Sequence, residues 1–365
     1  MAQRMTKKRD TLSVLDLFAG AGGLTEGLHR SSSAFETVRA VESDVLAAAT
    51  FDANHGAGVT YAGRIEDWLK EDTVPSVDLL VGGPPCQGFS QLNRSKVGIE
   101  RNDLWKSYAE TVVRAQPKWF VLENVPAFLK SAEFAELQKA SEPGGWLADW
   151  RFKAWVLMAA DFGAAQLRRR AVVIGHHRDL PEPAWPVPTH VGSHKPLKKV
   201  LLGVAETVTR QDFPDRQTEV DGRLVPGTFE THELHVTRHY EPRSLDRFAH
   251  IPEGGNRHNL PWALQTPGWR NHTTGSGDVM GRLLWDKPSV TIRTEFFKPE
   301  KGRYLHPTEP RAITHFEAAR IQGFPDDYKW VGGKTHIARQ IGNAVPIPLG
   351  VAIGKAIARA ASESA

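Results

Sequence analysis

Cysteine is the scarcest reactive residue in this chain, because its 365 residues include only one, Cys86. A single thiol excludes a disulfide framework and excludes zinc sites built from several cysteines. No apolar run approaches the roughly 20 residues that a membrane-spanning helix needs. The basic start MAQRMTKKRD is followed by no apolar core of a secretory signal. We therefore expect a protein of the reducing cytosol, with no membrane partner.

A strong charge of one sign is also missing. Lys and Arg total 46 against 42 Asp and Glu, which gives a formal net charge of +4. This mild excess permits a polyanionic partner without requiring one. Hydrophobic residues make up 40% of the chain, enough for a real core in one large domain or two moderate ones.

The first half of the chain alternates short apolar runs with longer amphipathic stretches. The expected strands are LSVLDLF, TVRAVE, VDLLV, KWFVLE, KAWVLM and AVVIG. Residues 104–115 repeat apolar side chains at helical spacing, and residues 347–361 do so near the end of the chain. This alternation predicts an α/β fold, with a doubly wound sheet and helices on both faces. The late helix is expected to pack back on the sheet.

The character of the chain changes after Gly175. DLPEPAWPVPTH is rich in proline and indicates a linker or the edge of a second unit. From there to about Asp286, Gly, Pro, His and Arg are frequent and periodicity is weak. We expect loops to dominate this region.

The one cysteine lies in the stretch VGGPPCQGFSQ, residues 81–91. Pro84 and Pro85 each remove a backbone donor, so this stretch is neither regular helix nor central strand. The apolar run VDLLV before it has the length of a buried strand. Open α/β sheets keep their chemistry at such strand ends. We interpret Cys86 as a nucleophile on a loop past a strand, since structural thiols usually lie within apolar elements.

A glycine turn follows the first strand, in LDLFAGAGG. Glycines let the backbone approach a ligand closely, and the N-terminus of a following helix favours negative groups. The dinucleotide fingerprint requires a glycine where Thr25 stands. The next strand ends in Glu42, placed as the acid that holds ribose hydroxyls. The pair predicts a nucleoside site without a pyrophosphate cradle, which fits S-adenosylmethionine (AdoMet); a tight structural turn is the alternative.

Two further segments put polar groups at strand ends. WFVLENVPAFL ends a strand with Glu123 and Asn124, which are either surface groups or site residues. QLRRRAVVIG puts Gln166, Arg168 and Arg170 ahead of another strand, with both arginines on one face because strand side chains alternate. A solvated basic cluster is the ordinary alternative for such a run. Neither segment by itself shows whether its polar residues belong to a site or to the surface.

Taken in order, these segments resemble one known family. DLFAGAGG, GGPPCQGFS, ENV, QLRRR, HFEAARIQGFP and RQIGNAVP follow one another as in the DNA cytosine-5 methyltransferases, from about Leu12 to Ile357. The resemblance implies a Rossmann-like AdoMet-dependent methyltransferase fold with a mixed sheet and a smaller, loop-rich target-recognition domain. The implied catalytic domain spans residues 1–187 and is completed by 340–365. The implied recognition domain spans 188–311, and a return segment spans 312–339.

By this resemblance the substrate is a cytosine that is flipped out of duplex DNA. Cys86 is expected to add to carbon 6 of the base, and Glu123 to hydrogen-bond N3 and the exocyclic amine. Arg168 and Arg170 are expected to hold the extruded nucleotide. Further DNA contacts are expected from Gln87, Ser90, Asn93, Arg94 and Gln166.

The resemblance also implies which residues hold AdoMet, with Glu42 on the ribose and Pro85 near the methionine part. The full set is Asp16, Phe18, Gly20, Gly22, Gly23, Leu24, Glu42, Ser43, Ile65, Pro85, Leu104, Asn343, Ala344 and Val345.

Two positions depart from the family pattern. Arg64 stands where an aspartate usually meets the adenine amine, so we expect a neighbour at 65–67 to replace that contact. Phe316 stands where an arginine usually precedes the glutamate that is Glu317 here. Glu317 and Arg320 do match the family, and we expect them to tie the domains together.

The region 188–311 mixes Arg, His, Asn and Gly in RHYEPRSLDRFAHIPEGGNRH and WRNHTTGSGDVMGRLLW. This mixture suits contacts with DNA backbone and base edges, although many of these residues are expected to be exposed loop residues only. His232, His235 and His239 suggest a metal site. Without cysteine or nearby paired acids, we expect no metal there.

Three alternatives stay open at this point. An RNA cytosine-5 methyltransferase on the same fold is disfavoured by the sizeable variable region and by the lack of a second cysteine. A catalytically inactive relative is disfavoured by the presence of Cys86, Glu123 and both arginines. A nicotinamide-dependent oxidoreductase is disfavoured by Thr25. We expect a monomeric enzyme of the bacterial cytosol that modifies double-stranded DNA beside a separate, cognate restriction endonuclease.

Overall fold

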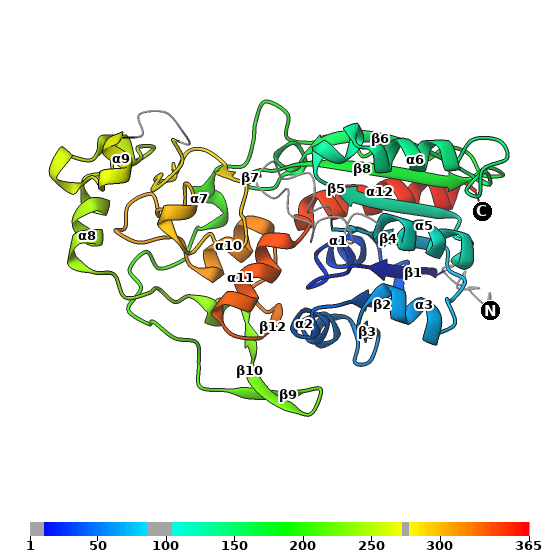
Figure 1. Cartoon of the computed structure of the whole chain (residues 1–365), viewed down its shortest axis with the longest axis horizontal. Helices are drawn as coiled ribbons and strands as arrows, with labels where there is room; N and C mark the ends of the chain where they lie inside the picture. The colour runs from blue at the N-terminus through cyan, green and yellow to red at the C-terminus, as the bar shows by residue number, and fades with distance from the viewer. Residues whose placement is uncertain (1–10, 86–103, 272–276, 365) are drawn as a thin grey trace, which may run out of the picture.

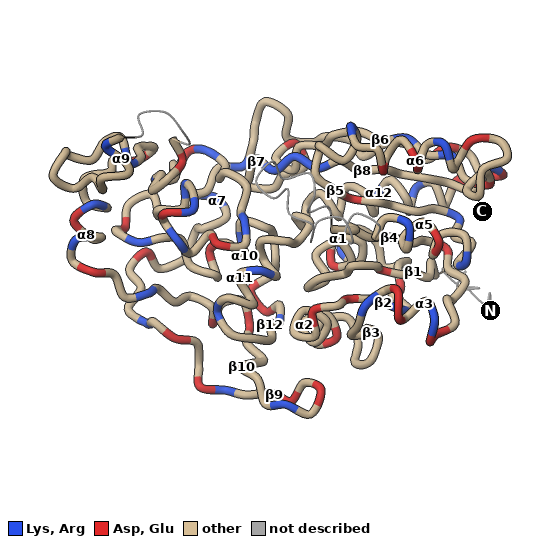
Figure 2. The backbone as a smooth tube through the Cα atoms, viewed as in Figure 1, with Lys and Arg blue, Asp and Glu red and all other residues tan. Residues whose placement is uncertain are grey.

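The structure, a computed structural model, describes residues 11–85, 104–271 and 277–364. Cys86 and four residues predicted to touch DNA, namely Gln87, Ser90, Asn93 and Arg94, lie outside these ranges. A sheet-based unit lies at the right of Figure 1 and a second unit at the left. Acidic and basic residues are interspersed over both units (Figure 2).

A seven-stranded sheet forms the centre of the first unit. Its strands are β1 (Leu12–Leu17), β2 (Phe35–Glu42), β3 (Thr60–Ala62), β4 (Leu79–Gly82), β5 (Trp119–Asn124), β6 (Trp150–Met158) and β8 (Arg169–His177). The order is β3-β2-β1-β4-β5-β8-β6, and β8 runs antiparallel to both of its neighbours while the other pairs are parallel. The predicted fold class is confirmed. The sequence indicated every strand of this sheet except the short β3.

Helices cover both faces of the sheet. They are α1 (Gly23–Ser31), α2 (Val45–His55), α3 (Ile65–Glu71), α5 (Leu104–Ala115), α6 (Ala132–Ala140) and α12 (Ile347–Glu363). Leu80 packs in the core under α3, α5 and α6, whereas its neighbour Val81 packs in the core under α1 and α12. Because β4 is buried on both faces, its sequence is an unbroken apolar run and does not alternate.

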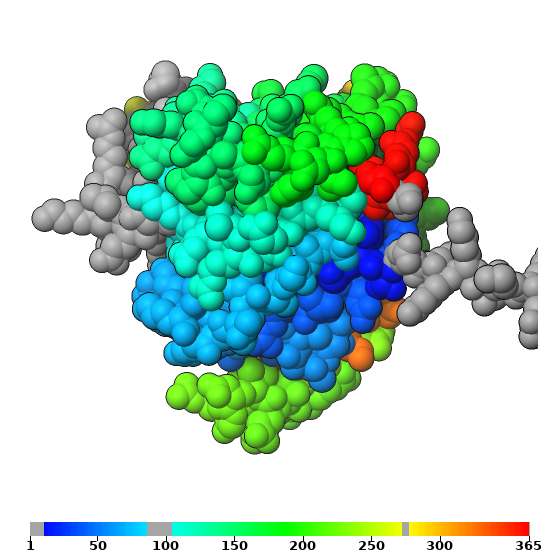
Figure 3. Space-filling view, turned by 90° about the vertical axis from the view of Figure 1, so that its right-hand side faces the viewer, coloured from blue at the N-terminus to red at the C-terminus, as the bar shows by residue number. Residues whose placement is uncertain are grey.

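The last helix, α12, packs on the sheet beside α1, as the sequence predicted. A β-carbon on Gly27 of α1 would lie 2.6 Å from the α-carbon of Gly350 in α12, so only glycine permits this approach. In Figure 3 the end of α12, in red, borders the blue N-terminal residues. The two ends of the described chain thus build one core.

The second unit is built around a three-stranded sheet in the order β12-β10-β9. Its elements are α7 (Leu197–Val200), β9 (Gln217–Val220), β10 (Arg223–Glu230), α8 (Pro242–Ala249), α9 (Pro267–Asn271), β11 (Ser289–Val290), α10 (His315–Gln322), β12 (Lys329–Val331) and α11 (Lys334–Asn343). Short 3-10 turns lie at 231–234, 257–259, 262–264 and 299–301. Within the described ranges no single helix is long and apolar enough to cross a membrane, and α11 with α12 meets that test only as a pair bent by 42°.

One hairpin in this unit was not expected from the sequence. β9 and β10 turn on Asp221 and Gly222, whose φ values of 51° and 69° suit a type I′ turn. An Asp-Gly pair between two strand-forming runs is a recognised hairpin signal. This hairpin lies in the region that we expected to be dominated by loops.

Strand pairs also join segments that are distant in the sequence. β11 pairs in parallel with β7 (Gln166–Leu167), which precedes β8 in the first unit. β12, from the return segment 312–339, pairs with β10 from the implied recognition domain. The boundary implied at residue 311 therefore separates two strands that pair in one sheet. Composition alone does not reveal this pairing, because it depends on contacts between distant residues.

Candidate active site

A cavity of about 540 Å³ opens at the carboxyl ends of β1, β2, β4 and β5. Open α/β sheets bind ligands at this edge, where strand order reverses about β1. Most residues predicted to hold AdoMet line it: Asp16, Phe18, Gly20, Gly23, Leu24, Glu42, Ser43, Pro85, Asn343, Ala344 and Val345. Glu123, Arg168 and Arg170 line the same cavity. The predicted AdoMet site and the predicted catalytic site therefore share one cavity.

The glycine turn between β1 and α1 forms one wall. Phe18, Gly20 and Gly22 have left-handed backbone angles, with φ values of 56°, 57° and 84°. This conformation is costly for a residue with a β-carbon, so Phe18 is held in place by its surroundings. Gly23 passes Val345 so closely that a β-carbon would lie 2.8 Å from the Val345 carbonyl oxygen. The turn and the C-terminal segment thus form this part of the cavity wall together.

Glu42, at the end of β2, is fixed by the main chain. Its Oε2 accepts a hydrogen bond from the Gly20 N–H at 2.8 Å, and its Oε1 accepts one from the Asp44 N–H at 2.7 Å. Burial raises the pKa of Glu42, and the two backbone donors oppose that rise because they favour the carboxylate. Asp44 in turn caps α2, accepting hydrogen bonds from two backbone N–H groups.

Asp16, near the end of β1, is a second carboxyl group on this wall. It is 2% exposed, and its Oδ2 accepts a hydrogen bond from the Thr25 hydroxyl at 2.6 Å. Burial raises the pKa of Asp16 to about 7, with the Thr25 bond opposing the rise and the nearby Glu42 adding to it. Thr25, the residue that breaks the dinucleotide fingerprint, therefore has a partner of its own.

Glu123 and Arg170 face each other at the other end of the cavity. Arg170 Nε lies 2.7 Å from Glu123 Oε1, and the two side chains are 15% and 12% exposed. A β-carbon on Gly83 would lie 3.1 Å from Glu123 Oε2, so the loop after β4 runs close against this carboxylate. Asn124 Nδ2 donates to the Pro84 carbonyl at 3.0 Å and fastens that loop to the end of β5. The chain then continues from Pro85, in the cavity wall, to Cys86.

Arg168 lies deeper than Arg170 and is 2% exposed. Its guanidinium donates to the carbonyl oxygens of Ile292 at 2.8 Å and Gly342 at 3.0 Å. Burial, with the charge of Arg170 adding to it, lowers the pKa of Arg168 to about 9. Its Nε is buried and has no hydrogen-bond partner within the described part of the chain. Arg168, which lies between β7 and β8, therefore links its own segment to the chain after β11 and to the end of α11.

Gln166 is completely buried. Its amide donates to Gln322 Oε1, and its own Oε1 accepts from the Ile292 N–H at 3.2 Å. These bonds leave it no surface for the DNA contact that the sequence suggested. In this structure Gln166 supports the cavity wall from behind.

Three of the residues predicted to hold AdoMet do not line the cavity. Gly22 caps the N-terminus of α1, where a β-carbon would lie 2.5 Å from His55 Nε2. Ile65 is buried in the core under α3, and Leu104 packs against that core at the start of α5. Arg64 precedes α3 and pairs with Glu66 at 3.0 Å.

Several lining residues were not predicted: Thr291, Arg293, Thr294, Arg339 and Gln340. The pairing of β11 with β7 carries residues 291–294 from the variable region to the cavity. Arg293 is held there by Tyr304, whose hydroxyl accepts from its Nε at 3.0 Å. The short run SVTI indicates a strand, but its sequence does not say which strand it joins.

Glu317, the glutamate after Phe316, forms an ion pair with Arg311. Arg311 donates to both oxygens of Glu317, at 2.9 Å and 2.7 Å, and both side chains are almost fully buried. Burial acts to raise the pKa of Glu317, but the hydrogen bonds and charge of Arg311 outweigh it, so the pKa is lowered. Phe316 itself is buried under Arg320, which lies 4.8 Å from its ring centre.

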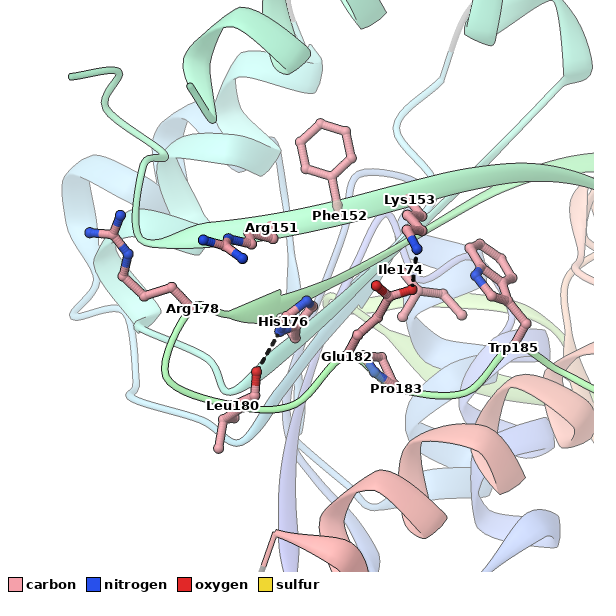
Figure 4. A pocket seen from close by; sticks show the side chains of 10 residues that line it. All are labelled: Arg151, Phe152, Lys153, Ile174, His176, Arg178, Leu180, Glu182, Pro183 and Trp185. Atoms are coloured by element: carbon pink, nitrogen blue, oxygen red, sulfur yellow. Dashed lines mark hydrogen bonds and ion pairs between the residues drawn. The ribbon is translucent and has the colours of Figure 1, made fainter. Parts of the chain in front are cut away.

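A second hollow, of about 360 Å³, lies at the opposite end of the sheet (Figure 4). It is formed where β6 and β8 meet the chain at 178–185, and His176 there hydrogen-bonds the Leu180 carbonyl. No residue predicted to be catalytic or to hold AdoMet lines it. Within the described ranges, no group of three or more His, Cys, Asp and Glu residues is placed to hold a metal ion.

Comparison with known proteins connects this architecture to a family. The family described as C-5 cytosine-specific DNA methylase matches residues 12–359. The type II methyltransferase M1.HphI of Haemophilus parahaemolyticus is 31% identical, over 95% of this chain and 87% of its own. M.PspPI of Psychrobacter sp. (strain TA137) is 33% identical, over 95% of this chain and 79% of its own.

Solved structures show the same fold. A prophage-encoded E. coli protein described as a DNA modification methyltransferase superposes with a TM-score of 0.71 at 24% identity, over 96% of this chain and 100% of that chain. The Dnmt2 methyltransferase of S. pombe superposes with a TM-score of 0.57 at 16% identity, over 95% and 99%. Together with the residues that line the cavity, these findings lead to one conclusion. The chain belongs to the family of C-5 cytosine-specific DNA methylases.

Proposed function

We propose that this protein transfers a methyl group from AdoMet to carbon 5 of a cytosine flipped out of a specific double-stranded DNA sequence. The observation that carries the proposal is the single cavity that holds both the Glu42 wall and the Glu123–Arg170 pair. Family membership supports the reaction class. The cavity supports the assignment of its two ends to the methyl donor and to the base.

The residues of the first end fit AdoMet. Glu42 is fixed by two backbone donors and faces the cavity, so its carboxylate can accept hydrogen bonds from ribose hydroxyls. Thr25 is turned toward Asp16, and no third glycine opens a cradle for a pyrophosphate. We assign donor binding to this wall and to Asn343, Ala344 and Val345. AdoMet, when bound, supplies an electrophilic methyl group.

Cys86 is the proposed nucleophile. Carbon 5 of cytosine is a poor nucleophile, so covalent addition at carbon 6 is needed to activate it. The sulfur bonds to carbon 6, and the electron pair of the ring double bond makes carbon 5 enamine-like. After methylation, carbon 5 loses its proton and the sulfur leaves carbon 6. The thiolate is the reactive form of a cysteine, and nearby positive charge favours it. Arg168 and Arg170, which line the cavity, are the proposed source of that charge.

Glu123 is the proposed partner of the base. Protonation of N3 neutralises charge as the sulfur adds, and a carboxyl group beside N3 supports it. Thymine presents the opposite hydrogen-bonding pattern, so Glu123 also selects cytosine. We propose that Arg170 orients Glu123 through their ion pair and contacts the extruded nucleotide. Arg168, which is bonded to main-chain carbonyls, is proposed to position this wall.

The second unit is the proposed reader of the DNA sequence, with residues 188–311 supplying most contacts. The relatives named as type II methyltransferases support a role as the modification enzyme of a restriction–modification system. A cognate restriction endonuclease would then act separately at the same sequence.

Labelled AdoMet tests the reaction directly. The protein is incubated with the label and duplex DNA, and the labelled base is mapped. Label in cytosine of DNA supports the proposal. Transfer to RNA instead of DNA would favour an RNA methyltransferase, and no transfer to either would favour an inactive relative.

The covalent step has its own tests. Cys86→Ser should abolish transfer while it keeps much of the DNA binding, because serine is the poorer nucleophile. Replacing the target with 5-fluorocytosine blocks loss of the proton at carbon 5, so a protein–DNA adduct should survive denaturation. An active serine variant contradicts the covalent mechanism.

A further inference from the structure

We propose that the second hollow (Figure 4) binds a nucleoside monophosphate, with the phosphate held by Arg151 and Arg178 and the base beside Trp185. This hollow shares no lining residue with the active-site cavity. The inference therefore goes beyond the proposed methyl transfer and does not depend on it.

The chain after β8 forms the hollow because its prolines keep it out of the sheet. β6 is an edge strand that pairs with β8 alone. The following segment, DLPEPAWP, contains Pro181, Pro183 and Pro186, and proline has no N–H to donate to a strand. Residues 181–188 accordingly form no helix or strand, and a space of about 360 Å³ is left against the sheet. A volume near the lower end of the range for ligand pockets, about 300–1,000 Å³, suits one small molecule.

His176, which lines the hollow, has one ring nitrogen left for a ligand. Its Nδ1 lies 3.0 Å from the Leu180 carbonyl oxygen and 3.1 Å from that of His177. Because a carbonyl oxygen only accepts, Nδ1 carries the hydrogen, and Nε2 of the neutral ring is an acceptor. His176 is 7% exposed, and no residue in the described part of the chain hydrogen-bonds its Nε2. A hydroxyl or amino group of a ligand can supply that hydrogen bond.

Two arginines supply positive charge at one end of the hollow (Figure 4). Arg151 of β6 lies directly opposite His176 of β8 in the strand pairing, so both side chains are on one face of the sheet. Among the residues that the structure describes, none forms an ion pair with Arg151. Arg178 lies 3.5 Å from Asp149, and such a half-exposed pair is weak. Both guanidinium groups are therefore available to phosphate oxygens, which their planar shape matches.

The other end of the hollow is aromatic. The Trp185 indole lies there, with its ring centre 5.3 Å from that of Trp155. Ile174, which is 4% exposed, adds an apolar surface to the lining. Glu182 lies beside the indole and pairs with Lys153 at 2.7 Å, and about half of each side chain is exposed. The Glu182 carboxylate can therefore still accept hydrogen bonds from a ligand.

These features match the parts of a nucleotide in order. The arginines suit the phosphate, and the indole suits a base that stacks on it. Between the two ends, His176 Nε2 and the Glu182 carboxylate are acceptors for ribose hydroxyls. Inorganic phosphate would use the arginines only, and an apolar ring would use the indole only. The arrangement thus favours a ligand that joins a phosphate to a ring through a hydroxyl-bearing sugar.

Calorimetric titration of the full-length protein with guanosine 5′-monophosphate tests the inference. Guanine is neither the adenine of AdoMet nor the cytosine of the proposed target. The titration is made with saturating S-adenosylhomocysteine, the molecule that AdoMet becomes when it loses its methyl group, so that the active-site cavity is filled. The nucleotide should bind with one-to-one stoichiometry. Guanosine alone and inorganic phosphate alone should each bind at least about tenfold more weakly.

Two variants locate the ligand. Arg151→Met removes the guanidinium from an exposed position and should weaken nucleotide binding by roughly 10–100-fold, the loss expected for a hydrogen bond between charged groups. Lys139→Met, on the exposed side of α6, is the matched control and should bind the nucleotide as the wild type does. Both variants should transfer methyl groups at the wild-type rate, because neither residue lines the active-site cavity.

The outcomes decide this inference separately from the proposed function. Failure of the wild type to bind the nucleotide overturns the inference, and so does equal affinity for guanosine alone or for phosphate alone. An unchanged affinity in Arg151→Met would place the ligand elsewhere and would also overturn it. None of these results bears on methyl transfer, which the experiment with labelled AdoMet tests by itself.

Discussion

Glu123 and Arg170 form the ion pair on which the proposed chemistry depends most. Their side chains are 12% and 15% exposed, so each has lost most of its contact with water and depends on the other. The Gly83 backbone close to Glu123 leaves little room for the carboxylate to swing away. Arg170 also donates to the Arg169 carbonyl at 2.8 Å, which limits its own movement. The ion pair and the nearby Gly83 backbone therefore restrict the orientation of the Glu123 carboxylate in the cavity wall.

Glu123→Gln should lower the rate of methyl transfer by roughly 10²–10⁴-fold, because an amide cannot support protonation of N3. The rate is measured in single turnovers with labelled AdoMet at saturating DNA. Binding of AdoMet, measured by calorimetry, should change little, since Glu123 lies at the other end of the cavity. Glu136→Gln, on the exposed side of α6, is the control and should transfer at the wild-type rate. A Glu123→Gln rate within tenfold of wild type would count against the assigned role.

At the scale of whole elements, the crossing of α1 and α12 holds the glycine turn in place. α1 begins at the cavity wall, and α12 follows directly after the GNAVP segment that also lines it. Gly27 and Gly350 let the two helix backbones touch, and Gly354 similarly makes room for Ser31. Helix packing this close sets the separation of the two cavity walls, because backbones cannot move aside as side chains can.

Gly27→Ala should destabilise the protein by about 1–3 kcal/mol, because its β-carbon would meet the Gly350 backbone at 2.6 Å. The free energy of unfolding is measured in urea. Gly268→Ala is the matched control, since a β-carbon on that helical glycine would have no other atom within 4 Å. It should leave stability unchanged or raise it by up to about 1 kcal/mol through helix propensity. Equal stability of the two variants would contradict the tight crossing.

Across the whole molecule, neutral histidines that are buried or half-buried connect stability to pH. Burial lowers the pKa of His55 to about 3, and lowers those of His306 and His315 to about 4. The unfolded chain takes up these protons near pH 6.5 and the folded chain does not. Each histidine therefore contributes stability that is complete above pH 6.5 and is lost as the pH falls toward its folded pKa. Asp16 acts in the opposite direction, because its folded pKa is raised.

The contribution of one histidine can be isolated by comparing a variant with the wild type. Between pH 6.5 and 4.5, unfolding free energies of wild type and His306→Gln should converge by about 1.4 kcal/mol per pH unit, because the variant lacks this proton uptake. Urea unfolding at several pH values measures the difference. His258→Gln, at an exposed position, should follow the wild type in parallel. A constant gap between wild type and His306→Gln over this range would refute the prediction.

Local sequence patterns were sufficient to predict many of the helices and strands of this protein. Apolar runs located every strand of the central sheet but β3, and helical spacing located α5 and α12. The positions of Glu42 and Glu123 at strand ends brought both to the cavity, because parallel strands present their carboxyl ends at one edge. The role of Cys86 stays a prediction from its sequence context. Each of these features depends on residues that are neighbours in the chain.

Only the tertiary structure decided which distant groups meet. Arg168 donates a hydrogen bond to the carbonyl of Ile292, and Gln166 donates one to Gln322. Residues 291–294 reach the cavity through the pairing of β11 with β7. The bond from Thr25 to Asp16 likewise follows from the way α1 lies against β1. Such contacts depend on strand pairing and helix packing between segments far apart in the sequence. No local periodicity specifies those partners, because the same short run can pair with more than one strand.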